Sequence, residues 1–284
     1  MLLKKIIPCL VAAFLVACGD DGGNSTSPSE STSESDKATK SAEESSSSLT
    51  IPEGWDWNVP KETRLNPEIT YDSMTDSRDG KTYKTVKIGD QTWMAENLNY
   101  ADSARTESLR RRSWCYENVK RNCEVAGRLY TWAAAIDSVK LANDADNPQD
   151  CGYGKTCILP AKVRGICPSG WHLPTEAEWI SLFNSVGGSS TVGMVLKSQS
   201  GWYNNGNGTD AFGFSALPAG NRDHERDSNR SFLKEGNYAS FWSSTESEYS
   251  SSSVCFMYLY YDDDDARLDF GQKDYGFSVR CLKD

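Results

Sequence analysis

The stretch CPSGWHLPTEAEW, residues 167–179, decides the fold of this chain because it joins a cysteine, a turn and a helix start. The Pro-Ser-Gly triplet after Cys167 is typical of a turn. Thr175 precedes Glu178 by three residues, the spacing of a capping box, in which both side chains bond backbone groups of the first helical turn. Apolar residues follow at helical spacing up to a glycine pair at 187–188, so we expect a helix that begins directly after Thr175.

On either side of this stretch, the hydrophobic pattern predicts helices early and short strands late. Residues 82–95 alternate around Gly89-Asp90, as in a β-hairpin. Residues 127–139 carry apolar side chains near helical spacing and are expected to form the first of two main helices, the second being the one after Thr175. A short third helix is expected at residues 190–198, and further strands at 212–214, 241–242, 254–261 and 277–282. The pattern predicts an α+β fold with a curled, loop-rich antiparallel sheet.

Seven of the nine cysteines lie beyond residue 50, and export would favour disulfides among them. The expected pairs are Cys115–Cys123, Cys151–Cys157 and Cys167–Cys281. The first two pairs flank short polar turns, and the third closes a loop of about 115 residues, which stabilises by ~4–5 kcal/mol in the chain-entropy model. Cys255 is left over and shares its strand phase with apolar residues, which favours a buried free thiol. A disulfide between Cys255 and Cys281 would overturn this assignment.

The N-terminus has the pattern of a targeting segment. Two lysines precede about a dozen apolar residues, too few to span a bilayer roughly 30 Å thick. The run ends in Leu-Val-Ala-Cys, which resembles a bacterial lipobox, so residues 1–17 are predicted to be a signal peptide and Cys18 to carry lipid. The alternative is an ordinary secretory signal in which Cys18 has no role.

The residues after the signal divide into a tether and a domain. Residues 18–50 consist largely of Ser, Thr, Asp, Glu and Gly, and are expected to stay disordered as a spacer on the order of 30 Å long. Residues 51–78 form a lead-in segment, and residues 79–284 the predicted domain. The lipid would anchor the protein to the outer membrane of the cell envelope, and the Asp20-Asp21 pair is compatible with either the surface or the periplasmic face.

Composition argues against nucleic acid as a partner and supplies aromatic residues that could stack on a ligand. The formal net charge is −10, and an acidic domain argues against nucleic-acid binding, which needs a basic face. The chain contains 13 tyrosines and 9 tryptophans, which can supply rigid stacking surfaces, although most of the tryptophans are expected in the core.

Several ordered motifs resemble a known bacterial family. They are residues 79–83 (DGKTY), 93–98 (WMAENL), 127–130 (GRLY), 167–179, 214–220 (FSALPAG), 241–246 (FWSSTE) and 276–281 (GFSVRC). This set is similar to the Fibrobacter succinogenes major paralogous domain, and more distantly to formylglycine-generating, sulfatase-modifying domains. The resemblance implies a C-type-lectin-like fold, in which the N- and C-terminal strands pair and a long loop region carries the binding face.

Two departures from related domains bear on activity. The sulfatase-modifying enzymes use a close pair of late cysteines, whereas this chain offers only Cys255 if Cys281 is bridged. Calcium-dependent sugar lectins use Glu-Pro-Asn or Gln-Pro-Asp together with Trp-Asn-Asp, and the chain contains none of these tripeptides. The chain also lacks a nucleophile elbow and a phosphate loop, so we do not expect an enzyme.

A binding face is predicted around the late strand at residues 254–261. Alternation places Cys255, Met257 and Leu259 on one side and aromatic residues on the other. The predicted exposed set is Tyr258, Tyr260, Asp262, Asp264, Arg267 and Asp269, with Trp202 and Trp242 as neighbours. The alternative is that the tyrosines pack under the long loops and only the aspartates reach water.

The acidic run after this strand allows a second interpretation. Calcium takes six to eight oxygen ligands, and Asp262, Asp263, Asp264 and Asp265 could supply several of them. A solvated acidic loop without a metal is the alternative.

These observations lead to one main functional hypothesis. We expect a cell-envelope lipoprotein whose lectin-like domain binds an extracellular glycan or protein, with calcium as the only cofactor considered. A structural envelope protein without a ligand site is the first alternative. An oxidative, sulfatase-modifying type of enzyme that uses Cys255 is the second.

Overall fold

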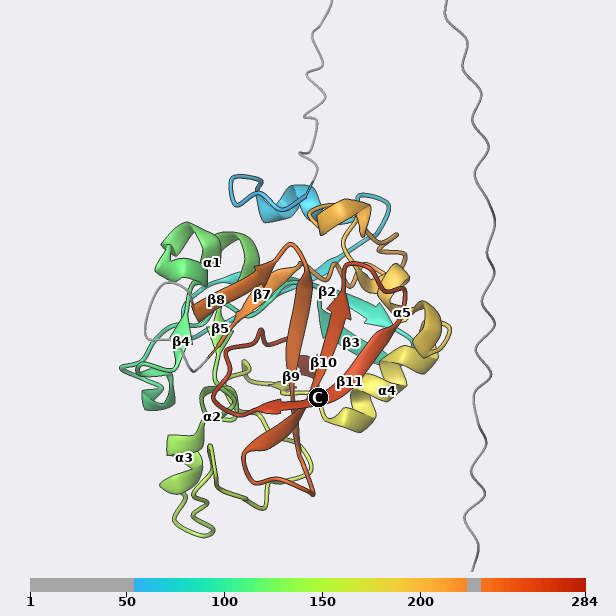
Figure 1. Cartoon of the computed structure of the whole chain (residues 1–284). Coiled ribbons are helices and arrows are strands. Elements are labelled where there is room, and N and C mark those ends of the chain that lie inside the picture. Colours follow the sequence, from blue (N-terminus) through green and yellow to red (C-terminus); the bar gives the residue numbers. More distant parts are fainter. Residues whose placement is uncertain (1–53, 224–230) are drawn as a thin grey trace, which may run out of the picture. The chain divides into compact units, whose positions relative to one another are not determined.

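A computed structural model describes residues 54–223 and 231–284 (Figure 1). The predicted signal peptide, Cys18 and the tether lie outside the described residues. The described part contains two five-stranded sheets, one two-stranded sheet and five short α-helices. None of these helices is long and apolar enough to cross a membrane.

The first sheet joins the two ends of the domain. Its strand order is β1 (Asp72–Thr75), β2 (Thr82–Ile88), β3 (Gln91–Met94), β12 (Leu282–Lys283) and β6 (Trp171–His172), all antiparallel. β2 and β3 form the predicted hairpin, and Gly89 in its turn takes a φ of 58°, a conformation that glycine adopts at little cost. Leu282 lies opposite both Trp93 and His172, so the last strand is inserted between two earlier ones.

The second sheet comes from the last third of the chain. Its order is β11 (Ala266–Gln272), β10 (Ser253–Tyr260), β9 (Tyr238–Glu246), β7 (Ala219–Arg222) and β8 (Phe232–Glu235). Its pairs are antiparallel except β7 with β9, where Gly220 lies beside Ala239 in parallel. The small third sheet pairs β4 (Ser113–Trp114) with β5 (Leu129–Tyr130). The fold is therefore α+β with mainly antiparallel sheets, as predicted.

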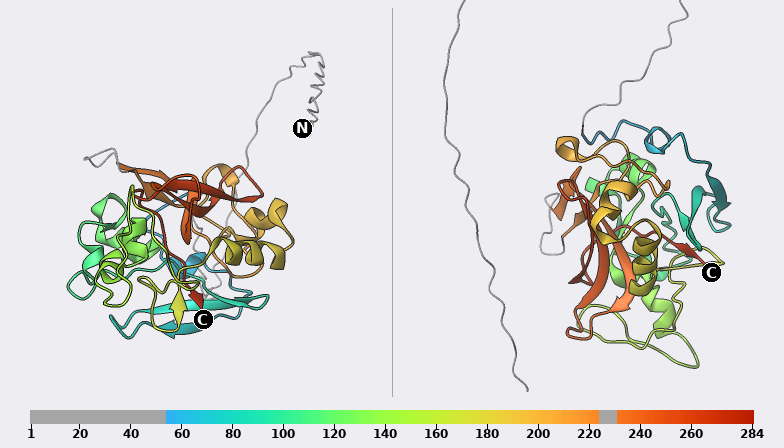
Figure 2. Two further views of the ribbon diagram at one scale, coloured as in Figure 1. Left: turned by 90° about the horizontal axis from the view of Figure 1, so that it is seen from below. Right: turned by 90° about the vertical axis from the view of Figure 1, so that its right-hand side faces the viewer.

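The two large sheets lie on opposite sides of the core, and one helix lies at one side of the space between them (Figure 2). This helix, α4 (Glu176–Ser185), begins at Thr175 with both hydrogen bonds of the predicted capping box. On α4, Trp179 stacks on Trp93 of the first sheet at 4.6 Å and lies 6.0 Å from Phe241 of the second, measured between ring centroids. The short third helix is also present, as α5 (Ser189–Leu196).

The prediction of one helix over residues 127–139 is wrong, so the predicted pair of main helices is not confirmed. The segment begins in β5 and continues as α2 (Trp132–Ala135) and α3 (Ser138–Ala142), separated by Asp137 at φ 57°. Ser108 fixes this break, because its hydroxyl donates to Asp137 at 2.6 Å and accepts from the amide of Val139 at 2.9 Å. The remaining helical segments are α1 (Lys120–Ala126) and the 3-10 turns η1 (Lys61–Arg64), η2 (Glu107–Leu109), η3 (Tyr116–Asn118) and η4 (Tyr203–Asn205).

Two of the expected late strands also differ. Residues 212–214 form a turn, because the buried carboxylate of Asp210 accepts from the amide of Ser215 at 2.7 Å and from its hydroxyl at 2.6 Å. In the segment 277–283 only β12 is a regular strand, while Phe277 and Ser278 make single bridges to Tyr130 and Phe241.

The predicted disulfides are confirmed. Cys115–Cys123, Cys151–Cys157 and Cys167–Cys281 are bonded, and Cys255 is free and buried. The Cys167–Cys281 bond lies in the main core and fixes the quoted stretch 167–179 to the C-terminal segment.

The segment predicted as a lead-in belongs to the fold from residue 54 onward. It supplies η1 and the strand β1, which pairs with β2. Its Arg64 is 2% exposed and its Asn66 5%, so both are buried against residues of the predicted domain.

Candidate aromatic binding groove

The strand β10 separates the core of the domain from an outer face. Cys255, Met257 and Leu259 are buried, whereas Phe256, Tyr258 and Tyr260 alternate with them and are half-buried. The predicted alternation of this strand is confirmed. In an antiparallel pair, directly opposite residues share a face, so the register identifies which neighbours lie beside these aromatic rings.

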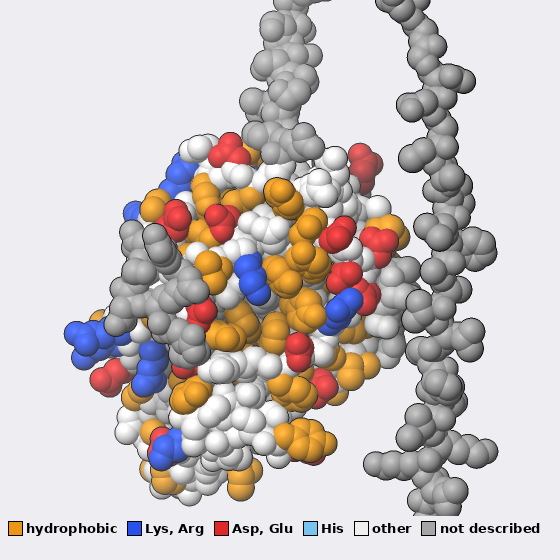
Figure 3. Space-filling model, in the orientation of Figure 1, with side chains coloured by type: hydrophobic (Ala, Val, Ile, Leu, Met, Phe, Trp, Pro, Cys, Tyr) orange, Lys and Arg blue, Asp and Glu red, His pale blue; other side chains and the backbone are white. Residues whose placement is uncertain are grey.

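Cross-strand pairs assemble four aromatic rings on this outer face. Tyr260 lies opposite Tyr238 of β9, and their ring centroids are 4.6 Å apart. Tyr258 lies 6.0 Å from Tyr238 and 5.6 Å from Phe256 along its own strand. We call Tyr238, Phe256, Tyr258 and Tyr260 the aromatic face. Figure 3 shows hydrophobic side chains gathered over β9, β10 and β11, with acidic and basic side chains around them.

Three residues of the aromatic face, Tyr238, Phe256 and Tyr258, line a groove of about 280 Å³. We call it the aromatic groove. It is lined by Asn221, Asp223, Leu233, Lys234, Tyr238, Ser240, Phe256, Tyr258, Asp269, Tyr275 and Phe277. The lining combines aromatic rings with carboxylate, ammonium, amide and hydroxyl groups from all five strands of the second sheet and from the segment after β11. Such a mixture can hold a ligand that presents apolar patches and hydrogen-bonding groups together.

The six tyrosine, aspartate and arginine residues of the predicted site divide into three groups. Tyr258 and Asp269 line the groove, and Tyr260 extends the aromatic face beside it. Arg267 lies directly opposite Tyr258, and its hydrogen bond to Tyr258, followed by one to Asp265, raises the pKa of its guanidinium. Asp262 and Asp264 are exposed in the turn between β10 and β11, outside the groove lining.

The prediction that Trp202 and Trp242 lie beside the exposed face is wrong. Both side chains are 0% exposed, so neither can stack on a ligand. The indole of Trp202 donates to Ser198 at 3.1 Å, and that of Trp242 donates to the carbonyl of Tyr130 at 2.7 Å. Trp242 instead supports the groove from below, because its ring lies 4.3 Å from that of the lining residue Phe277.

The sequence did not indicate most of the groove residues that lie outside β10 and β11. Tyr238 could have been found, because it shares the phase of Ser240 in β9 and faces β10. Asn221, Leu233 and Lys234 come from the β7–β8 hairpin, whose position beside β9 depends on a parallel contact that no local pattern indicates.

The turn between β10 and β11 contains residues 262–265, and we call it the acidic turn. The side chain of Lys197 packs against it. The ammonium of Lys197 is buried and donates to the carbonyls of Tyr260, Tyr261 and Asp263 at 3.2, 3.3 and 2.9 Å. Burial lowers the pKa of Lys197, although the neighbouring aspartates oppose this shift.

The turn's carboxylates do not form a metal-binding cluster. Those of Asp263 and Asp265 pair with Arg267 at 3.1 and 3.3 Å. Within residues 54–223 and 231–284, no group of three or more His, Cys, Asp or Glu side chains is placed to hold a metal ion.

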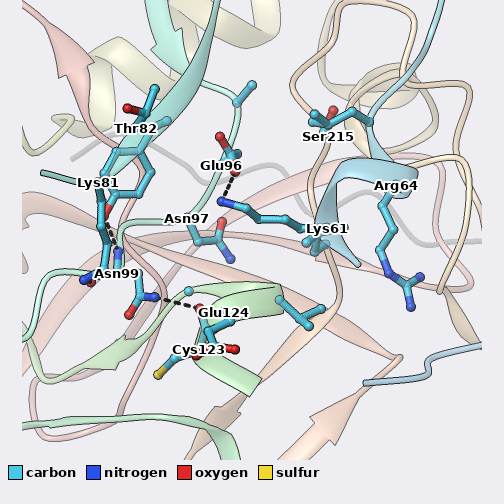
Figure 4. A pocket seen from close by; sticks show the side chains of 16 residues that line it. Lys61, Arg64, Lys81, Thr82, Glu96, Asn97, Asn99, Cys123, Glu124 and Ser215 are labelled. Carbon is cyan, nitrogen blue, oxygen red and sulfur yellow. Dashed lines mark hydrogen bonds and ion pairs between the residues drawn. The ribbon is translucent and has the colours of Figure 1, made fainter. Parts of the chain in front are cut away.

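A second, smaller cavity of about 130 Å³ lies where η1 meets β2, α1 and the segment that follows β3 (Figure 4). The side chain of Lys61 reaches into it and pairs with Glu96 at 2.5 Å. The amide of Asn97 is bonded to Ala126, Ser278 and Arg280. Because Lys61, Glu96 and Asn97 already have partners within the protein, this cavity is a weaker candidate than the aromatic groove.

The free thiol lacks the properties of a reactive cysteine. Cys255 is 1% exposed, and burial raises the pKa of its thiol to about 12. A reactive cysteine needs an accessible thiolate, so the environment of Cys255 disfavours its use in catalysis.

Residues 86–283 match the family model described as the Fibrobacter succinogenes major domain. Comparison with curated proteins found no match, and comparison with solved structures found none. The matched residues include the capping box, the Cys167–Cys281 disulfide and every strand of the second sheet. Because the match covers more than half of the chain, the protein belongs to the Fibrobacter succinogenes major domain family.

Proposed function

We propose that the protein is a cell-envelope lipoprotein whose domain binds a glycan in the aromatic groove. The observation that carries this proposal is the composition of the groove. Tyr238, Phe256 and Tyr258 offer ring faces for the apolar faces of a sugar, while Asp269 and Asn221 offer groups for its hydroxyls. A protein ligand with an aromatic side chain is the second candidate, because the same rings can stack on it.

The arrangement of the chain ends supports a C-type-lectin-like fold. Such a fold implies that the N- and C-terminal strands pair, and β12 lies between β3 and β6 with Leu282 opposite Trp93. The resemblance implies a binding face on a long loop region, whereas the aromatic groove lies on the strands of the second sheet, so the groove is proposed on its own geometry.

The envelope location rests on the N-terminal sequence. We propose that Cys18 is lipidated and that the lipid holds the domain at the outer membrane. Growth with a labelled fatty acid tests this directly. The full-length protein should take up the label and the Cys18→Ala protein should not, whereas label retained by the variant would contradict lipidation at Cys18.

Glycan binding is tested with an array and titration calorimetry on the full-length protein. Tyr258→Ala should weaken binding to the array hits by about tenfold or more, because a stacking ring is lost. Tyr249→Ala is the matched control, since Tyr249 is 89% exposed and does not line the groove. It should bind like wild type.

Three outcomes would count against the proposal. Equal effects of the two substitutions, or a Tyr258→Ala protein that has lost most of its stability, would contradict the role of the groove. An array without hits would favour the structural envelope protein, with no dedicated ligand site.

A further inference from the structure

Lys234 has an unusual backbone conformation for its residue type. It lies in β8 with a φ of 68°, in the left-handed region that L-residues with a long side chain rarely occupy. Nine non-glycine residues of the described ranges share a positive φ, and five of them are Asn or Asp, which tolerate it. Lys234 is the one of the nine that lines the aromatic groove.

The fold explains why a left-handed residue stands here. Gly220 of β7 faces this part of β8 so closely that a Cβ atom on it would lie 2.4 Å from the carbonyl oxygen of Leu233. The carbonyl of Lys234 also accepts from the amide of Asn237 at 3.0 Å, which starts the turn into β9. Glycine or asparagine would meet both demands with less strain.

A lysine at this position adds a cation to the groove. Its ammonium lies over the ring of Tyr238, 4.5 Å from the ring centroid. Among the described residues it has no carboxylate partner, although the chain has ten more acidic than basic residues (40 against 30). An ammonium donates hydrogen bonds and accepts none, so its best partner is an acceptor such as a carboxylate.

We propose that Lys234 is a specificity-determining residue of the aromatic groove, positioned by its strained backbone to bind the carboxylate of an acidic sugar stacked on the neighbouring ring of Tyr258. Strained residues persist at binding sites when the surrounding structure holds them in place. The inference rests on the proposed glycan-binding function and narrows its ligand to uronic-acid glycans.

Two probes test the inference on the full-length protein, a hexamer of galacturonic acid and the neutral hexamer cellohexaose. Wild type should bind the acidic hexamer more tightly. Lys234→Gly should weaken binding of the acidic hexamer by about tenfold or more and that of cellohexaose much less. Lys234→Arg, which keeps the charge, should retain most of the affinity for the acidic hexamer.

Melting temperature separates strain from ordinary packing. Lys234→Gly should melt within about 1 °C of wild type or above it, because glycine relieves the left-handed strain. Lys87 is the matched control, an exposed lysine of β2 with ordinary backbone. Lys87→Gly should lower the melting temperature by about 2–4 °C and leave binding unchanged.

The outcomes distinguish the two proposals. Cellohexaose binding that depends on Tyr258, with no preference for the acidic hexamer, would overturn the role of Lys234 and leave the glycan-binding function standing. Unchanged acidic binding in Lys234→Gly, or a loss of stability equal to that of Lys87→Gly, would also overturn it. Failure of both hexamers to bind wild type would count against both proposals.

Discussion

The imidazole of His172 lies 2.7 Å from the carboxylate of Asp284, the last residue of the chain. Its other ring nitrogen lies 2.9 Å from Glu178, the capping-box residue of α4. His172 is 2% exposed and stands on β6, beside β12. One side chain therefore connects the helix start, the first sheet and the C-terminus, and its charge should influence stability.

The His172 contacts predict a pH-dependent contribution to folding stability. Burial opposes protonation, but the hydrogen bonds to Glu178 and Asp284 outweigh it and raise the pKa of His172 above 6.5. This contribution is therefore complete below pH 6.5 and is lost as the pH rises through the raised value. The pKa of Glu178 is lowered below 4.5, since its hydrogen bonds to His172 and Thr175 outweigh burial, so its contribution is lost as the pH falls through that lowered value.

The measurement is the difference in unfolding free energy between wild type and His172→Gln from pH 4 to 9. The difference should be largest between about pH 4.5 and 6.5 and fall by about 1 kcal/mol toward pH 9. Taking the difference cancels other titrating groups, such as the buried Asp210, whose pKa burial raises to about 6. A difference that does not change with pH would show that His172 is not protonated when it contacts Glu178 and Asp284.

Lys197 leads to a prediction about calcium. Because its ammonium already bonds three carbonyls of the acidic turn, added calcium and added chelator should both leave the melting temperature unchanged. Lys197→Met should lower the unfolding free energy by about 2–3 kcal/mol, since it leaves buried carbonyls without a donor. Stabilisation of wild type by several degrees in millimolar calcium would instead favour a metal site at Asp262, Asp263, Asp264 and Asp265.

Features that depend on neighbouring residues could be predicted from the sequence. The capping box at Thr175, the hairpin around Gly89 and the alternation of β10 each follow from spacings of a few residues. The first expected helix failed because Ser108, 29 residues before Asp137, breaks it by a tertiary hydrogen bond. A periodic pattern carries no information on such a partner.

Only part of the groove could be predicted, because its other residues also depend on contacts between distant segments. Tyr258 and Asp269 follow from one strand and its neighbour, but Lys234 and Asn221 reach the groove through the β7–β8 hairpin. The burial of Trp242 is equally non-local, because Phe277, 35 positions along the chain, packs over it. Amphipathic tryptophans suit both core and surface, so composition alone could not separate these environments.

Cys255 should resist alkylation in the folded protein. Burial raises the pKa of its thiol to about 12, so very little thiolate forms at pH 8. On a chain that begins at Ile51, which lacks Cys9 and Cys18, mass spectrometry after iodoacetamide treatment without reductant should find no modification in the native state and one modified cysteine, Cys255, in urea. Rapid labelling of the native protein would contradict the buried position and reopen the hypothesis of an oxidative enzyme.

The N-terminal boundary of the folded unit should lie well before residue 79. A chain that begins at Asp79 loses η1 and β1, exposes the edge of β2, and removes Asn66, whose amide donates to the carbonyl of Asp210 at 3.0 Å. It also removes the ring of Trp57, which lies 5.1 Å from that of Tyr116.

We therefore expect this shorter chain to lose on the order of 3 kcal/mol or more of unfolding free energy, or to fail to fold. A chain that begins at Ile51 serves as the control and should melt like the full-length protein. Asn66→Ala in the full-length chain tests one contact alone and should cost about 1–2 kcal/mol, because the Asp210 carbonyl loses its donor. Equal melting temperatures for the chains starting at 51 and 79 would mean that the early segment packs on the domain without stabilising it.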